Sequence, residues 1–446
     1  MLHLSVFMSP TGGHVGGWRM PQAVTNAGFE IEPWLELARI LERGKFDMMF
    51  LADGNGVNGV ENPDLLSRNP TLRPVVIEPV SLMAAMSMVT SRIGLVATAT
   101  TTYDEPYSIA RRFASLDRLS KGRSAWNLVT TSVAEDALNF SRDEHVEQKD
   151  RFERATEFAE VVRGLWDSWG EDAFIQNKET GRFLDPSKVK LLNHKGKHFQ
   201  VRGPLNCARS PQGAPVIIVA GGSPEARELA AQHADVIFTI TETKAAALSF
   251  YDDIKGRLGK YGRAADHLKV FPGAALFVGR TEAEAEAQYR ELQDLIPESV
   301  GVQLLSKMLS HDLSKYPPDG PLPEITAEVR GIGSFRSVLL EMAKRDNLSI
   351  RQVYQRVLPA RGHVVFKGTA SQIADQMQDW YESKACDGFN LVAPYVPGGL
   401  EAVVDLVIPE LQRRGLFRKD YEGSTLREHL DVPIPADPFR VHAAAE

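Results

Sequence analysis

The stretch GRSAWNLVTTS, residues 122–132, has an apolar centre and ends in a row of small polar side chains. A strand on a protein surface alternates apolar and polar residues, whereas a strand in a core stays apolar. This stretch does neither, because its C-terminal end collects the amide and hydroxyl groups of Asn127, Thr130, Thr131 and Ser132. Such groups can bind a ligand with a polar edge, so we expect a binding site where this strand ends.

A second polar turn lies in VAGGSPEARELAA, residues 219–231. An apolar run leads into Gly221, Gly222 and Ser223, and Pro224 then opens a helical pattern. Glycines allow a ligand to approach the backbone, and the N-terminus of a helix presents unpaired N–H groups to an anion. The pattern is equally compatible with a tight strand-to-helix turn in which Ser223 caps the helix. Both interpretations stay open at this point.

Two further residues have side chains that can transfer protons. Asp53 closes the strand pattern FDMMFLAD, which places a carboxylate at the end of a strand, although a loop cap has the same signature. His14 lies in TGGHVGGWRMP, directly after the first predicted strand. An imidazole can donate or accept a proton near neutral pH, so His14 is a candidate for the site.

Other motifs are excluded by their context. GNGVNG, residues 54–59, has the glycine spacing of a dinucleotide-binding turn. It is followed by a segment with three prolines and no helical period, where that turn requires a helix, so we interpret it as a flexible loop over a site. The histidines show no His-x-x-x-His or His-Glu-x-x-His spacing, and we predict no metal site.

The composition of the 446 residues is that of a soluble globular protein, with 43% hydrophobic and 24% charged residues. A net charge of −7 gives no reason to expect nucleic acid or an anionic membrane as partner. Cys207 and Cys386 lie too far apart in the sequence to indicate a disulfide framework or a zinc cluster. No apolar run is long enough to span a membrane, and no signal peptide is evident, so we expect a cytoplasmic protein.

Apolar strand patterns alternate with helical patterns along the chain, which is typical of an α/β protein with a parallel sheet. The predicted strands are residues 4–8, 46–52, 93–100, 124–130, 214–220, 234–240, 274–279 and 388–393. Eight such units predict a single-domain TIM (β/α)8 barrel over residues 1–446, with a doubly wound open sheet as the alternative. In a barrel, the polar strand ends described above share one rim.

Three connections, at about 54–77, 170–213 and 294–368, are too long to be simple loops. We expect them to form a lid over the active face of the barrel. The alternative for each is a dimerisation arm.

With these motifs in place, the chain resembles the bacterial-luciferase-like flavin-dependent monooxygenases. It is most similar to the branch that includes the nitrilotriacetate, EDTA and dibenzothiophene-sulfone monooxygenases. The resemblance rests on TGGHVGGWRMP, FDMMFLADG, the stretch around NLVTTS, RFERATEFAEVVRGLWDSW and VAGGSPEARELAAQHADVIFT, and it covers almost the whole chain.

The resemblance implies a TIM-barrel enzyme that receives reduced FMN (FMNH2) from a separate NAD(P)H:flavin reductase. It further implies that O2 reacts through a flavin C4a-(hydro)peroxide, and that one oxygen atom enters a small organic substrate at N, S or C. Relatives of this kind form homodimers or homotetramers. The substrate itself cannot be read from the sequence, although Arg19, Arg68 and Arg73 indicate an anionic one.

The resemblance also implies roles for individual residues. Asp53, Ala97 and Thr98 would lie by the isoalloxazine, with a non-proline cis peptide expected between Ala97 and Thr98. Asn127 would lie near the polar edge of the ring. The phosphate and ribityl chain would be held by Thr130, Thr131, Gly222 and Ser223. The substrate side would be formed by His14, Asn55, Ser132 and His311.

The sequence departs from the family pattern at several positions. Phe152 stands where the family usually has tyrosine, so a hydroxyl contact to the flavin would be missing. Val219 and Ala226 replace a frequent glutamine and a frequent glycine near the anion-binding turn. Two alternative functions remain: an F420-dependent hydride-transfer oxidoreductase of the same superfamily, and a non-catalytic flavin-binding barrel.

Overall fold

The computed structural model describes residues 1–325, 333–360 and 362–440. Eight parallel strands form a closed barrel in the described chain, which confirms the predicted fold. They are β1 (His3–Met8), β2 (Met48–Leu51), β3 (Gly94–Thr100), β4 (Ser124–Val129), β7 (Val216–Ala220), β8 (Val236–Thr239), β9 (Lys269–Val278) and β11 (Gly388–Val392). The barrel closes because β9 pairs with β8 on one side and with β11 on the other.

Strand β9 begins earlier than predicted, because Pro272 and Gly273 interrupt its apolar run but still take part in the pairing. Strand β10 (Val364–Gly368) was not predicted. It pairs in parallel with the C-terminal half of β9, beyond the part that pairs with β8.

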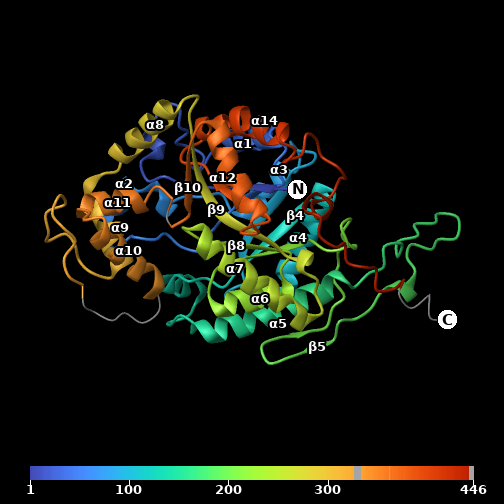
Figure 1. Ribbon diagram of the computed structural model, residues 1–446. Helices are drawn as coiled ribbons and strands as arrows, with labels where there is room; N and C mark the ends of the chain where they lie inside the picture. The colour runs from blue at the N-terminus through green and yellow to red at the C-terminus, as the bar shows by residue number, and fades with distance from the viewer. Residues whose placement is uncertain (326–332, 361, 441–446) are drawn as a thin grey trace.

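Helices cover the outside of the barrel, as Figure 1 shows. They are α1 (Glu32–Arg43), α3 (Pro79–Met86), α4 (Pro106–Ser120), α5 (Gln148–Trp166), α6 (Pro224–His233), α7 (Lys244–Arg257), α8 (Glu282–Asp294), α12 (Ala370–Glu382), α13 (Gly398–Ala402) and α14 (Ile408–Arg413). Several begin at a side-chain cap, which satisfies N–H groups that the helix leaves unpaired. At α12, Thr369 and Gln372 cap each other reciprocally.

The interior of the barrel is packed with side chains and forms no pore. Alternate strand residues point inward and include Met48, Phe50, Val96, Ile218 and Phe271. The N-terminal end of the barrel is plugged by Leu426 and Leu430 of α15 (Leu426–Leu430), together with Val432. The C-terminal ends of the strands therefore offer the open face for a site.

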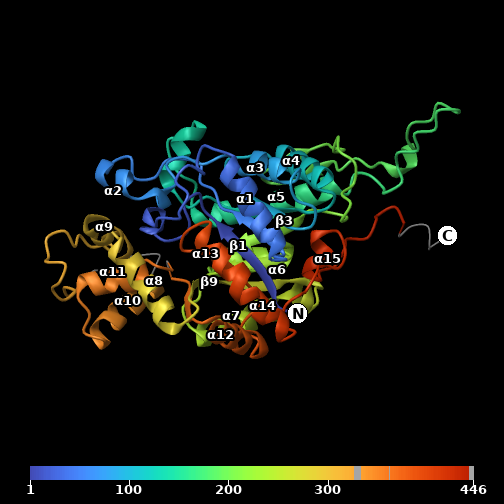
Figure 2. The ribbon, with the colours of Figure 1, turned by 90° about the horizontal axis from the view of Figure 1, so that it is seen from above.

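Two of the long connections meet at the C-terminal face. Segment 54–77 follows β2 and contains α2 (Pro63–Arg68), and segment 294–368 contains α9 (Glu298–Leu309), α10 (Gly333–Arg345) and α11 (Ile350–Val357). The amide of Asn62 donates to Gln303 Oε1 at 3.2 Å, and the Ser299 hydroxyl donates to Asp64 Oδ2 at 3.2 Å. In Figure 2 these helices lie together at one side of the barrel.

Segment 170–213 packs on the outside of α5, where Lys197 pairs with Glu153 at 2.6 Å, and against the start of α4, where the Tyr107 hydroxyl donates to Asn206 Oδ1 at 3.2 Å. The expectation that it covers the active face stays a prediction. The segment leaves the C-terminal end of α5 and leads into the start of β7, and it carries the short hairpin of β5 (His194–Lys195) and β6 (Gln200–Val201). Arg209 in this segment donates to Asp167 Oδ1 at 2.6 Å and to the backbone oxygen of Pro435 at 3.0 Å. A connection from a helix to the next strand in a barrel starts and ends at the N-terminal face, which explains these contacts of Arg209.

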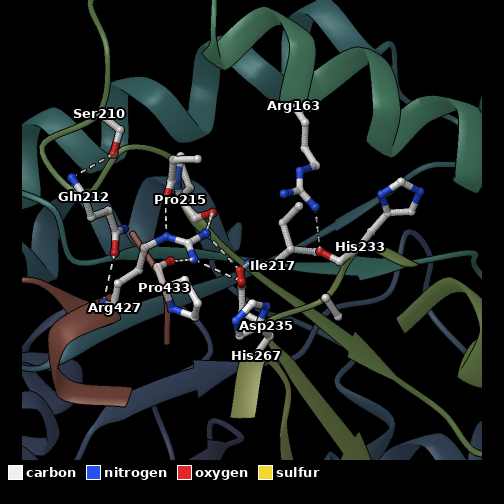
Figure 3. A network of polar contacts seen from close by, with 12 residues as sticks. Arg163, Ser210, Gln212, Pro215, Ile217, His233, Asp235, His267, Arg427 and Pro433 are labelled. Carbon is white, nitrogen blue, oxygen red and sulfur yellow. Dashed lines mark hydrogen bonds and ion pairs between the residues drawn. The ribbon is translucent and has the colours of Figure 1, made fainter. Parts of the chain in front are cut away.

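A buried polar network joins the C-terminal segment to this N-terminal face (Figure 3). Arg427 donates to Asp235 Oδ1 at 3.0 Å and to Asp235 Oδ2 at 2.9 Å. Asp235 also accepts a hydrogen bond from the N–H of Ile217 at 2.9 Å. The side chain of Gln212 connects the same network to the 170–213 segment.

Candidate active site

A cleft with about 910 Å³ of empty space opens at the C-terminal ends of β2, β3, β4 and β7. Its polar lining comes mostly from the ends of these neighbouring strands and from the loop that follows β2. The lining includes Asp53, Asn55, Arg73, Thr98, Thr100, Thr130, Thr131, Ser132, Asp136 and Phe152. The structure thus brings together eight of the residues that the sequence singled out, from four separate segments.

Hydroxyl groups of β3 and the end of β4 form an ordered row in the cleft. The Thr98 hydroxyl donates to the backbone oxygen of Leu51 at 2.8 Å and accepts from Asn127 Nδ2 at 2.8 Å. The hydroxyls of Thr100 and Thr131 lie 2.7 Å apart. Thr131 has a φ of 34°, an unusual value for a β-branched residue that is held here by its neighbours. The row is therefore hydrogen-bonded within the protein.

Asn127 lies directly behind this row, paired in register with Thr98. Its side chain is buried, and its Oδ1 atom has no hydrogen-bond partner in the described residues. A buried carbonyl without a donor costs free energy, so a donor from a ligand fits this position.

Asp53 is the cleft residue with the strongest electrostatic perturbation. Burial raises the pKa of its carboxyl from 3.8 to about 6, and the charges of Glu78 and Asp136 act in the same direction. A hydrogen bond from Gly54 and the charge of Arg73 oppose the rise without cancelling it. Asp53 is mostly protonated below pH 6 and mostly ionised above it, so it can exchange a proton near neutral pH.

A second carboxylate, Asp136, fixes the loop that follows β2. It lies in a 3-10 turn (Ala134–Phe140), and its Oδ2 accepts from the N–H of Asn55 at 3.3 Å. Asn139 Nδ2 donates to the backbone oxygen of Asn55 at 3.0 Å. Burial raises the pKa of Asp136. Sequence reasoning missed this residue, because nothing in its local pattern indicates the contact with the loop at 54–59.

The turn at Gly222 and Ser223 stands next to the cleft, whose lining includes Val219 and Ala220 of the preceding strand. The Ser223 hydroxyl caps α6 and accepts from the N–H of Ala226 at 3.2 Å. A side-chain carbon added at Gly222 would meet only the Thr239 hydroxyl, at 3.9 Å, so the backbone there is open to a ligand. The structure therefore shows Ser223 as a helix cap. The N–H groups at the N-terminus of α6 also make this turn suitable for an anion.

Six predicted residues are not part of the cleft lining: Asn127, Gly222 and Ser223, described above, and His14, Ala97 and His311. His14 is fully buried, its Nδ1 accepts from the N–H of Gly16 at 3.0 Å, and its Nε2 lies 3.4 Å from Gln293 Nε2. Ala97 faces the helix layer on the outer side of β3. His311 follows α9 and contacts the Tyr316 hydroxyl at 3.3 Å. For His14 the sequence could not reveal Gln293 as a neighbour, because the two residues are 279 positions apart in the chain.

The expected cis peptide between Ala97 and Thr98 is not found, since the cis bonds of the described chain are Gly203–Pro204 and Val396–Pro397. Both residues lie in the regular part of β3 and pair with Trp126 and Asn127 of β4.

The three arginines that suggested an anionic substrate have different surroundings. Arg19 donates to the backbone oxygen of Leu295 at 2.8 Å, and Arg68 pairs with Asp64 at 2.7 Å on the surface of α2. Arg73 alone of the three lines the cleft.

Among the described residues, no group of three or more His, Cys, Asp or Glu side chains is placed to hold a metal ion. The helices of the described chain include none long and apolar enough to cross a membrane.

Comparison with known proteins places these features in a family context. The family model described as luciferase-like monooxygenase matches residues 7–386. The chain is 50% identical over 440 residues to N-acetyl-S-(2-succino)cysteine monooxygenase of Bacillus subtilis, covering 98% of both. It is 47% identical over 441 residues to nitrilotriacetate monooxygenase component A of Aminobacter aminovorans, covering 97% of both. A solved riboflavin lyase, described with modified FMN and riboflavin, superposes with a TM-score of 0.82 at 30% identity, covering 97% of this chain and 96% of that one.

Proposed function

The chain belongs to the luciferase-like monooxygenase family, and on this premise we propose that it is the oxygenating component of a two-component system that uses reduced FMN and O2. It would insert one oxygen atom into a small organic substrate at N, S or C. The observation that carries the proposal is the cleft at the C-terminal face, with its row of hydroxyls and the buried, unpaired Oδ1 of Asn127. Since the close relatives are named monooxygenases, neither hydride transfer with F420 nor a non-catalytic barrel is proposed.

The residues present fit a flavin mononucleotide. Thr98 and Asn127 would bind the polar edge of the ring, where the Asn127 oxygen needs a donor. Hydroxyls at the end of β4, with the open backbone at Gly222, would bind the ribityl chain and the phosphate. Asn55 and Ser132 would lie on the substrate side.

Reduced FMN, when bound, supplies the reaction with O2, and the protein supplies orientation, charge and exclusion of water. Asp53 holds or releases a proton at its carboxyl oxygens beside the reacting centre, which its pKa of about 6 permits near neutral pH. Segments 54–77 and 294–368 contact each other at this face, and we propose that they keep water from the site.

The relative from Aminobacter aminovorans is named component A, which implies a separate partner component. We propose that the partner of this chain is an NAD(P)H:flavin reductase that supplies FMNH2. A homodimer or homotetramer is proposed from the family resemblance alone.

The test is oxygen and NADH consumption by the purified protein with FMN and a generic flavin reductase, in the presence of amines, thioethers and sulfones. We expect a substrate-dependent product that carries one ¹⁸O atom from ¹⁸O2, together with less hydrogen peroxide than the reductase produces alone. Failure to form product with any probe, together with no binding of reduced FMN, would overturn the proposal.

A further inference from the structure

The reaction proposed above gives no role to Arg73, although its side chain lines the cleft together with Asp53, Asn55 and Asn58. Within the described residues, its guanidinium forms neither a hydrogen bond nor an ion pair, and Asp53 acts on it only as a nearby charge. Burial lowers the pKa of Arg73, and the charge of Asp53 partly restores it. Arginine remains charged under these conditions, so a cation with five N–H donors faces the cleft without acceptors.

Other arginines that are removed from water in this protein are supplied with acceptors. Arg123 donates to the backbone oxygens of Ser120 and Ile93, both at 2.7 Å, and to further groups of Ser87 and Thr90. Arg263 donates to the backbone oxygens of Ala230, Ala231, Ala234 and His267. Such saturation is expected, because a buried charge without acceptors is costly. Arg73 differs from these arginines, because it is half-buried and its guanidinium is open to the cleft without an acceptor among the described residues.

The backbone holds Arg73 in a prepared position. Its φ of 54° and ψ of 57° are left-handed, the usual conformation of a residue that ends a short helical turn, here Pro70–Leu72. Its N–H donates to the backbone oxygen of Pro70 at 2.9 Å, and Pro74 follows it directly. The fully buried Asn69 caps this turn by accepting from the N–H of Thr71 at 3.2 Å. A hydrogen-bonded turn thus presents an unpaired cation to the cleft.

We infer that Arg73 binds a carboxylate of the organic substrate, and that the substrate is therefore an organic acid. A planar guanidinium matches a carboxylate with two parallel hydrogen bonds, which gives both affinity and orientation. The flavin phosphate is a less suitable occupant, because its proposed donors come from the end of β4 and from the turn before α6, whereas Arg73 belongs to the loop after β2. The inference rests on the proposed function and adds the substrate class to it.

The test uses calorimetric titration of thiodiacetate and iminodiacetate, each against its dimethyl ester, with the full chain in the presence and absence of oxidised FMN. For the wild type we expect at least one diacid to bind more tightly than its ester, by about 10-fold or more. Arg73→Gln should lose that preference, with the Kd for the acid rising about 10- to 100-fold, while Arg73→Lys retains part of it. Arg68→Gln is the matched control, since its guanidinium pairs with Asp64 outside the cleft, and it should bind like the wild type.

Binding of reduced FMN, measured anaerobically for the same proteins, separates the two hypotheses. If the wild type binds reduced FMN but prefers neither diacid over its ester, the inference about Arg73 is wrong and the proposed function stands. If Arg73→Gln loses affinity for reduced FMN instead of for the acid, Arg73 serves the cofactor and the inference is again wrong. If the wild type binds no reduced FMN, the proposed function itself fails.

Discussion

Strand β2 has an aspartate near each of its ends, and the two carboxyl groups have opposite environments. Asp47, directly before the strand, accepts from the N–H of Leu4 at 2.7 Å and contacts both His3 and the Arg418 guanidinium. Burial alone would raise the pKa of Asp47, but the charges of Arg418 and His3 outweigh it and the pKa is lowered. Asp53, two residues after the strand, is dominated by burial, and its pKa is raised to about 6.

Other polar groups at the two faces of the barrel show the same contrast between paired and unpaired. At the N-terminal face, Asp235 is paired with Arg427 (Figure 3), and the buried Asp117 accepts from Ser124 and Gln212. At the C-terminal face, Arg73 and the Asn127 oxygen lack partners in the described residues. These buried pairs at the N-terminal face stabilise the fold, whereas Arg73 and the Asn127 oxygen at the C-terminal face are left available for a ligand.

The largest expected effect comes from breaking the pairing at the N-terminal face. Arg418→Met leaves the fully buried Asp47 without its main cation, and we expect the free energy of unfolding to fall by about 3–5 kcal/mol. Urea denaturation followed by circular dichroism measures the change.

The matched control is Arg413→Met, because Arg413 is 70% exposed and pairs with Glu410 at the surface. It should change the free energy of unfolding by no more than about 0.5 kcal/mol. Equal losses in the two variants would contradict the view that the N-terminal face is stabilised by buried pairs.

A smaller effect is expected from Asp53→Asn at the other end of the strand. Because folding raises the pKa of Asp53 from 3.8 to about 6, its contribution to stability is complete below pH 3.8 and is lost as the pH rises through 6. The variant should not show this loss. If Asp53 transfers a proton, substrate-dependent turnover should fall about 100-fold and lose its inflection near pH 6.

Unfolding curves and turnover rates from pH 4 to 8 give the measurement, with the exposed Asp252→Asn as control. An inflection near pH 6 that persists in Asp53→Asn would assign the titration to another group.

The smallest effect is expected from a change in the lining of the cleft. Phe152 lines it where the family usually has tyrosine, and Phe152→Tyr would add a hydroxyl among the proposed flavin ligands. One new hydrogen bond is worth about 0.5–1.5 kcal/mol, so reduced FMN should bind about 2- to 10-fold more tightly. Phe183→Tyr, at an exposed position in segment 170–213, should leave the affinity unchanged. A weaker affinity in Phe152→Tyr would show that the phenol is not accommodated there.

Much of the barrel could be predicted from the sequence, because its strands are apolar runs and its helices begin with recognisable caps. The polar end of β4 was also informative, because Thr130, Thr131 and Ser132 interrupt an apolar pattern where a strand should end. The start and end of segment 170–213 at the N-terminal face could also have been derived, because a connection that follows a helix returns to that face.

Other features depend on contacts that no local pattern records. Arg73 and Asp136 lie in segments without helical or strand period, and they enter the cleft only through the loops that fold over it. His14 had the residue type and the position of a site residue, but the structure buries it against Gln293, 279 residues further along the chain. Such positions are set by the packing of distant segments.

The central claim is that the cleft at the C-terminal face binds reduced FMN. Ala220 is exposed and lines this cleft, so Ala220→Phe should fill part of it without disturbing the core. The most direct measurement is an anaerobic titration of reduced FMN into the wild type, into Ala220→Phe and into Ala287→Phe, whose substitution lies at an exposed position of α8. The account predicts that the wild type and Ala287→Phe bind alike and that Ala220→Phe binds at least about 10-fold more weakly, a loss of about 1.4 kcal/mol. Equal binding by all three proteins would place the flavin elsewhere and contradict the account.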